Sequence, residues 1–111
     1  MPDIDSEAVK KDIEDLAANL VAEHKEVAVQ EGMALLADSS DRLARYSEQL
    51  AQGLISEDQL REDLSLDLLA LAGMEGLKQK GLEQIRLAAF ANGVVTVLVG
   101  ATIRSVTGGI L

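Results

Sequence analysis

The chain contains one long stretch without a charged side chain, residues 87–103, which reads LAAFANGVVTVLVGATI. Arg86 and Arg104 border this stretch, and its only polar side chains are Asn92, Thr96 and Thr102. A helix that is apolar on every side has to be enclosed, either by other helices or by lipid. This stretch therefore decides the fold, because the rest of the chain or its surroundings have to enclose residues 87–103.

Lipid is one way to enclose the apolar stretch. As a helix, residues 87–103 span roughly 25 Å, which is near the lower limit for crossing a bilayer. The small residues within it and the basic Lys78, Lys80 and Arg86 beside it favour a membrane helix, with the acidic N-terminal part in the cytoplasm. Asn92 near its middle and the absence of a Trp or Tyr belt oppose this reading.

Protein is the other way to enclose it. A fully enclosed helix needs three or more neighbours, and a chain of 111 residues offers about three, so we expect a second copy to supply the remainder. This predicts a homo-oligomer in which Gly93 and Gly100 allow close backbone approach. The predicted oligomer interface, or lipid-facing surface in the membrane alternative, consists of Leu87, Phe90, Gly93, Val94, Val95, Val97, Leu98, Gly100 and Ile103.

Two lesser readings of the C-terminal region remain open at this stage. The density of β-branched residues from Val94 to Val99 is compatible with a short strand, and the stretch is also compatible with a segment lying on the surface. The apolar end, residues 108–111, is expected to pack against another part of the protein.

Upstream, residues 6–52 form an acidic region with helical periodicity. Apolar residues recur at helical spacing after a predicted N-cap at Ser6, and a second row of leucines follows in a different phase. We expect a break or a kink at residues 38–41, where Asp38-Ser39-Ser40-Asp41 separates the two rows.

The clearest helix boundary follows at residues 53–58. Gly53 is a typical C′ residue, and Ser56 with two acidic neighbours is a typical N-cap, which predicts a Leu-rich helix over residues 56–72. Leu66 and Leu69 widen its apolar row, which suggests burial on more than one side. With a basic-bordered, apolar segment at 74–111, the sequence predicts one all-α domain, residues 1–111, arranged as a hairpin or bundle of three or four helices.

The charge distribution bears on partners. The net charge is −9; residues 1–72 carry six basic and seventeen acidic side chains, a charge of −11, whereas residues 73–111 carry four basic and two acidic, a charge of +2. Nucleic acid is therefore not expected as a partner, because binding phosphates needs clustered Lys and Arg. The acidic N-terminal region has no apolar leader, so we expect a cytoplasmic protein, or a membrane-associated one whose acidic part is cytoplasmic.

The sequence shows no pattern of catalytic, cofactor-binding or metal-binding residues. There is no cysteine, and the single histidine, His24, lacks the Glu-x-x-His spacing of bundle metal sites and is expected at the edge of the core. The glycines at 73, 76 and 81 do not form a phosphate loop, and no small-molecule substrate is indicated. The sequence therefore predicts a non-catalytic structural or interaction protein.

Overall fold

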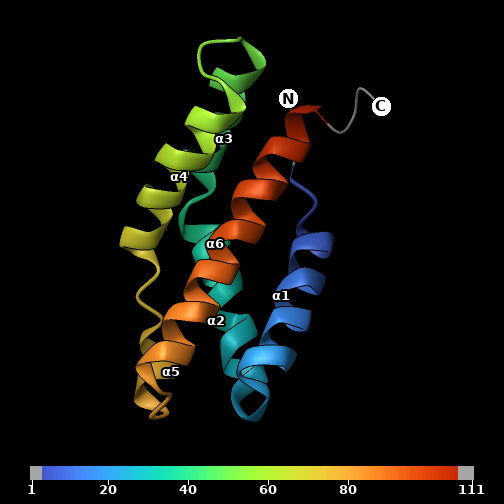
Figure 1. Cartoon of the computed structure of the whole chain (residues 1–111). Helices are drawn as coiled ribbons and strands as arrows, with labels where there is room; N and C mark the ends of the chain where they lie inside the picture. Colours follow the sequence, from blue (N-terminus) through green and yellow to red (C-terminus); the bar gives the residue numbers. More distant parts are fainter. Residues whose placement is uncertain (1–3, 108–111) are drawn as a thin grey trace.

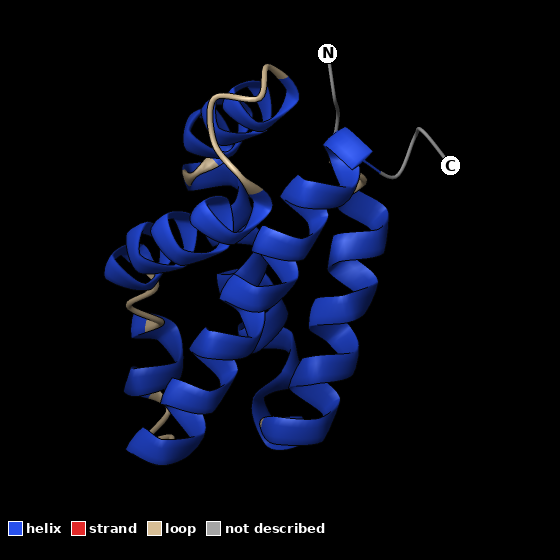
Figure 2. Ribbon diagram, turned by 45° about the horizontal axis from the view of Figure 1, so that its top comes forward, coloured by secondary structure: helices blue, strands red, loops and turns tan. Residues whose placement is uncertain are grey.

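The computed structural model of this chain describes residues 4–107, and all the regular structure in that range is helical (Figure 2). In chain order the elements are α1 (Ser6–Leu20), the 3-10 turn η1 (Ala22–His24), α2 (Lys25–Asp38), α3 (Ser40–Ala51), α4 (Glu57–Leu71), α5 (Glu75–Gln79) and α6 (Gln84–Thr107). The all-α prediction is confirmed, but three or four helices was too low a number. The alternative prediction of a short strand at Val94–Val99 is wrong, because these residues lie within α6.

The N-terminal region is divided once more than its periodicity suggests. Asp5, not Ser6, caps α1, since its Oδ1 accepts a hydrogen bond from the Ala8 amide at 3.1 Å. At Val21 the backbone leaves the helical region (φ −139°, ψ 44°), and η1 turns the chain into α2. The break expected at 38–41 is present, because α2 ends at Asp38 and α3 begins after Ser39.

The boundary at residues 53–58 is as predicted. Gly53 has φ +73°, a conformation that is costly for residues with a Cβ. Ser56 caps α4, accepting a hydrogen bond from the Gln59 amide at 3.1 Å. The predicted 56–72 helix is thus α4, within a residue at each end.

Helix α6 runs through the middle of the molecule. It packs against α1 on one side and against α3 and α4 on the other, while α2 packs on α1 and α5 (Figure 1). The fully buried large side chains of the core come from α1, α3, α4, α5 and α6, and they include Phe90, Leu98, Ile13, Leu43, Leu64 and Leu77. The molecule is elongated, 43 × 24 × 19 Å, with α6 along its length.

Polar contacts tie neighbouring helices together at four places, one of which joins the hydroxyls of Ser47 on α3 and Ser105 on α6 at 3.5 Å. Arg86 of α6 donates to the Leu20 carbonyl at the end of α1 and pairs with Glu23 of η1. The Glu31 carboxylate of α2 accepts a hydrogen bond from the Gly76 amide of α5. Between α3 and α4, the Tyr46 hydroxyl donates to Asp67 at 2.9 Å, and Arg42 pairs with the same carboxylate at 3.1 Å.

Candidate interaction surface

The inner face of α6 holds most of the residues predicted to lie at an interface. Six of them are buried against other helices of the same chain. These are Leu87, Phe90, Val94, Val95, Leu98 and Ile103. A single chain therefore encloses this face of α6 through α1, α3 and α4, and a further partner has to meet α6 on another side.

The remaining three predicted residues, Gly93, Val97 and Gly100, are half-buried. A Cβ on Gly93 would lie 2.5 Å from Leu16 Cδ2, so the close approach that this glycine permits is between α6 and α1 of one chain. A Cβ on Gly100 would meet only the end of the Arg104 side chain, with Nη1 at 3.3 Å. Gly93 thus serves the fold, whereas Gly100 faces outward.

The opposite side of α6 is uncovered over the lower half of the helix in Figure 1. The side chains exposed there recur at spacings of three and four residues, so they lie on one face. We call this face the outer strip: Ile85, Ala88, Ala89, Asn92 and Thr96. It carries no charged side chain, and its one large residue, Ile85, is 82% exposed.

The polar side chains of the outer strip are turned back onto the helix. Asn92 Nδ2 donates to the Ala88 carbonyl and Thr96 Oγ1 donates to the Asn92 carbonyl, both at 2.9 Å. Side chains bonded in this way leave fewer polar groups in need of water. The outer strip is therefore less polar than its sequence implies.

Three leucines on α4 are also exposed. Leu66 (65%), Leu69 (40%) and Leu71 (48%) are exposed in the single chain, so the burial on more than one side that Leu66 and Leu69 suggest is not provided by the other helices of this chain. Of the five exposed large apolar side chains in the described range, four thus lie on α4 and α6, and the fifth, Leu54, lies in the α3–α4 turn. Exposed apolar side chains mark an interaction site only where they are contiguous, so the candidate surface is restricted to the outer strip of α6.

The arginine in the first turn of α6, Arg86, is paired within the chain. The hydrogen bond from Arg86 holds the pKa of the Glu23 carboxyl below its ordinary value, aided by a backbone amide, and the same contact raises the pKa of Arg86. Arg86 is thereby engaged with α1 and η1, so this predicted border charge contributes little to attracting a lipid surface.

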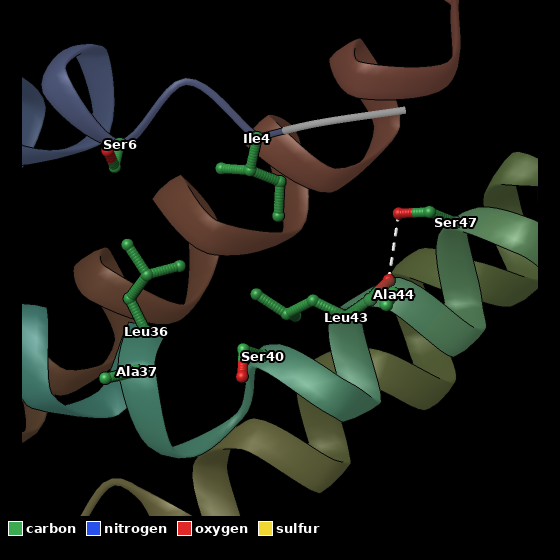
Figure 3. Close-up of a pocket in the computed structure, with 8 residues that line it drawn as sticks. All are labelled: Ile4, Ser6, Leu36, Ala37, Ser40, Leu43, Ala44 and Ser47. Atoms are coloured by element: carbon green, nitrogen blue, oxygen red, sulfur yellow. Dashed lines mark hydrogen bonds between the residues drawn. The ribbon is translucent and has the colours of Figure 1, made fainter. Parts of the chain in front are cut away.

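Two grooves elsewhere are the main hollows of the surface. One, of about 310 Å³, lies where the start of the chain meets α2 and α3; Ile4, Leu36 and Leu43 line it, and the hydroxyl of Ser47 on its rim is bonded to the Leu43 carbonyl (Figure 3). The other, of about 580 Å³, lies between α1 and α2, with Val29 and Met33 along it and Lys10, Glu14, Lys25 and Glu26 around it. The first groove is lined by serines without a lysine, histidine or carboxylate among them, and the second is bordered by two lysines and two glutamates.

His24 lies half-buried in η1, at the edge of the core as predicted. Across residues 4–107, no group of three or more His, Asp or Glu side chains is arranged to hold a metal ion. The predicted packing of residues 108–111 falls outside the described residues. The sequence matches no protein-family model, and it has no significant match among characterised proteins or solved structures.

Proposed function

We propose that this chain is a non-catalytic interaction protein that self-associates through the outer strip of α6. The observation that carries the proposal is an uncharged helical face with an 82% exposed isoleucine in a chain of net charge −9. Two copies of an acidic protein repel each other least where each carries the fewest acidic side chains, and residues 73–111 are the only region with a positive balance.

The size of the molecule is sufficient for such a contact. A stable pair buries about 800 Å² on each partner, and the long face of this molecule spans 43 by 24 Å. The predicted interface residues on the inner face of α6 form the core within each copy, so in this proposal they hold α6 in place and do not contact the second copy.

Light scattering of the untagged chain in detergent-free buffer, over a range of concentrations, tests the proposal. We expect a discrete oligomer that becomes a monomer on Ile85→Glu, with helix content unchanged. The matched control is Leu54→Glu, which charges a 67% exposed apolar position in the α3–α4 turn and is expected to leave the mass unchanged. A monomeric wild-type chain, or an Ile85→Glu variant of unchanged mass, contradicts the proposal.

Membrane association is the second candidate function, and the length and composition of α6 favour it. This 24-residue helix has a mean hydropathy of 1.6 over its most apolar window, and 44% of that window is buried. Insertion of α6 would withdraw Phe90, Val94 and Leu98 from the core, so we expect insertion only with loss of the tertiary packing. Flotation with liposomes distinguishes the two candidates: a folded oligomer stays in the soluble fraction, and an inserted chain floats with the lipid.

A further inference from the structure

One side-chain oxygen on the outer strip favours a second copy over lipid as the partner of this face. Asn92 lies in the middle of the strip, and its Nδ2 donates to the Ala88 carbonyl, but Oδ1 accepts no hydrogen bond from residues 4–107. Covering this oxygen with lipid would leave it unsatisfied, at a cost of about 1–3 kcal/mol. A partner that presents an amide at the same level removes that cost, and Asn92 of a second copy does so.

The shape of the strip determines how two copies fit. Ile85, the most exposed large apolar side chain, and Gly100, which presents no side chain, lie at equal distances along α6 on either side of the Asn92–Gly93 peptide bond. If two α6 helices lie antiparallel about a two-fold axis at that bond, Ile85 of each copy is level with Gly100 of the other. A large side chain then packs against a position with no Cβ, twice, as symmetry requires.

Charges at the ends of α6 favour the antiparallel arrangement. In it, Glu83 of one copy lies within about 3 Å, along the axis, of the level of Arg104 in the other. Both side chains are exposed, and neither forms an ion pair within the described part of the chain. A parallel arrangement would instead place Arg104 beside Arg104, where like charges repel.

On this basis, and resting on the proposed self-association, we propose that the chain forms a two-fold symmetric, antiparallel dimer through α6. In this dimer Asn92 of both copies lies near the axis, and Ile85 packs on Gly100 of the second copy. The crossing angle is shallow, about 20° as in helix bundles, because contacts seven residues from the axis separate at steeper angles. A polar residue at such a position is known to fix register and oligomeric state.

Cysteine cross-linking tests this geometry cleanly, because the chain contains no cysteine. Under mild oxidation, we expect a mixture of Ile85→Cys and Gly100→Cys chains to form the mixed disulfide several-fold more than either chain links to itself. Asn92→Cys is expected to form a disulfide with Asn92→Cys of the second copy. The control is Ala51→Cys, an exposed position on α3 that is expected to show only background linkage.

The outcomes separate this inference from the proposed function. A wild-type chain that light scattering shows to be monomeric overturns both. A wild-type dimer in which Ile85→Cys links to itself, or in which the mixed pair links no more than Ala51→Cys, overturns the antiparallel geometry alone. As a second test, Arg104→Glu is expected to weaken the dimer several-fold, and adding Glu83→Lys to restore it; failure to restore a folded double variant also overturns the geometry.

Discussion

Gly93 is the position where a single missing side chain allows two helices to pack. Since a Cβ there would lie 2.5 Å from Leu16 Cδ2 and 2.9 Å from its Cδ1, Gly93→Ala forces α6 and α1 apart or Leu16 out of its place. Overpacking of this kind costs about 1–3 kcal/mol. We therefore expect Gly93→Ala to lower the free energy of unfolding by that amount, measured by urea unfolding followed by circular dichroism.

The control for that prediction is on the same helix. A Cβ on Gly100 meets only Arg104 Nη1, at the end of a flexible side chain. Alanine is favoured over glycine in a helix by up to about 1 kcal/mol. Gly100→Ala should therefore leave the free energy of unfolding unchanged or raise it, and equal destabilisation by both substitutions would show that the contact with Leu16 is not the cause.

The Glu23–Arg86 contact gives the stability a pH dependence of known sign. The pKa of Glu23 is lowered in the folded chain, chiefly by its hydrogen bond from Arg86, from an ordinary value of 4.5. A lowered folded-state pKa contributes stability above the unfolded pKa, and this contribution is lost as the pH falls through the folded value. We expect the advantage of the wild type over Glu23→Gln to shrink as urea midpoints are measured from pH 6 down to pH 3.

The matched control for Glu23 is Glu26→Gln. Glu26 is exposed close by at the start of α2, and within residues 4–107 it makes no ion pair. Its substitution is expected to leave the acid dependence of the midpoint close to that of the wild type. If both variants change the acid dependence equally, the contact with Arg86 is not responsible.

At the scale of elements, the short helix α5 depends on a side chain from α2. An isolated five-residue helix is not stable in water, and α5 is held by Leu77 in the core and by the Glu31 carboxylate, which accepts from the Gly76 amide. We predict that Glu31→Ala increases hydrogen exchange at the amides of α5, because its first turn loses its acceptor. Exchange in α4 should be unchanged; a uniform increase across the chain would contradict the prediction.

Helix boundaries set by local chemistry could be predicted from the sequence, and those set by packing could not. Gly53 acts through its backbone conformation and Ser56 through its side chain, so the α3–α4 junction could be predicted from these residues. The end of α1 at Val21 has no glycine or proline to mark it, and the apolar spacing continues from Leu20 to Val27. There the chain turns because η1 packs α2 back onto α1, which is a tertiary cause.

The apolar stretch shows the same distinction. The sequence identified the helix at residues 87–103 but not its uncovered side, because a helix that is apolar all round has no polar face to mark its orientation. Asn92 and Thr96, four residues apart, were the available signal for the outer strip, yet Thr102 is equally polar and is fully buried, with Oγ1 bonded to the Leu98 carbonyl.

At the scale of the whole molecule, the core uses the inner side of α6 and the proposed self-association uses its outer side. Phe90 is fully buried in the core, whereas Ile85 is 82% exposed on the same helix. We predict that Phe90→Ala lowers the free energy of unfolding by about 3–5 kcal/mol, measured by urea unfolding. Ile85→Ala should change it by less than about 0.5 kcal/mol while lowering the mass measured by light scattering.

The opposite pattern would contradict this assignment. If Phe90→Ala changed the mass and left the unfolding transition in place, the inner face of α6 would have to meet a partner and not the core. That outcome would support the prediction made from the sequence, in which a second copy encloses these residues.

The position of α6 in the chain also has a consequence for synthesis. Helices α1 to α5 leave the ribosome before α6, yet α1, α3 and α4 bury their apolar residues on α6. Contacts between segments so far apart in sequence form late. At a translation rate of about 5–20 residues per second, the earlier helices remain without their central partner for seconds. We therefore expect these helices to complete their packing only after α6 has been synthesised, and the nascent chain to be a substrate for chaperones during that interval.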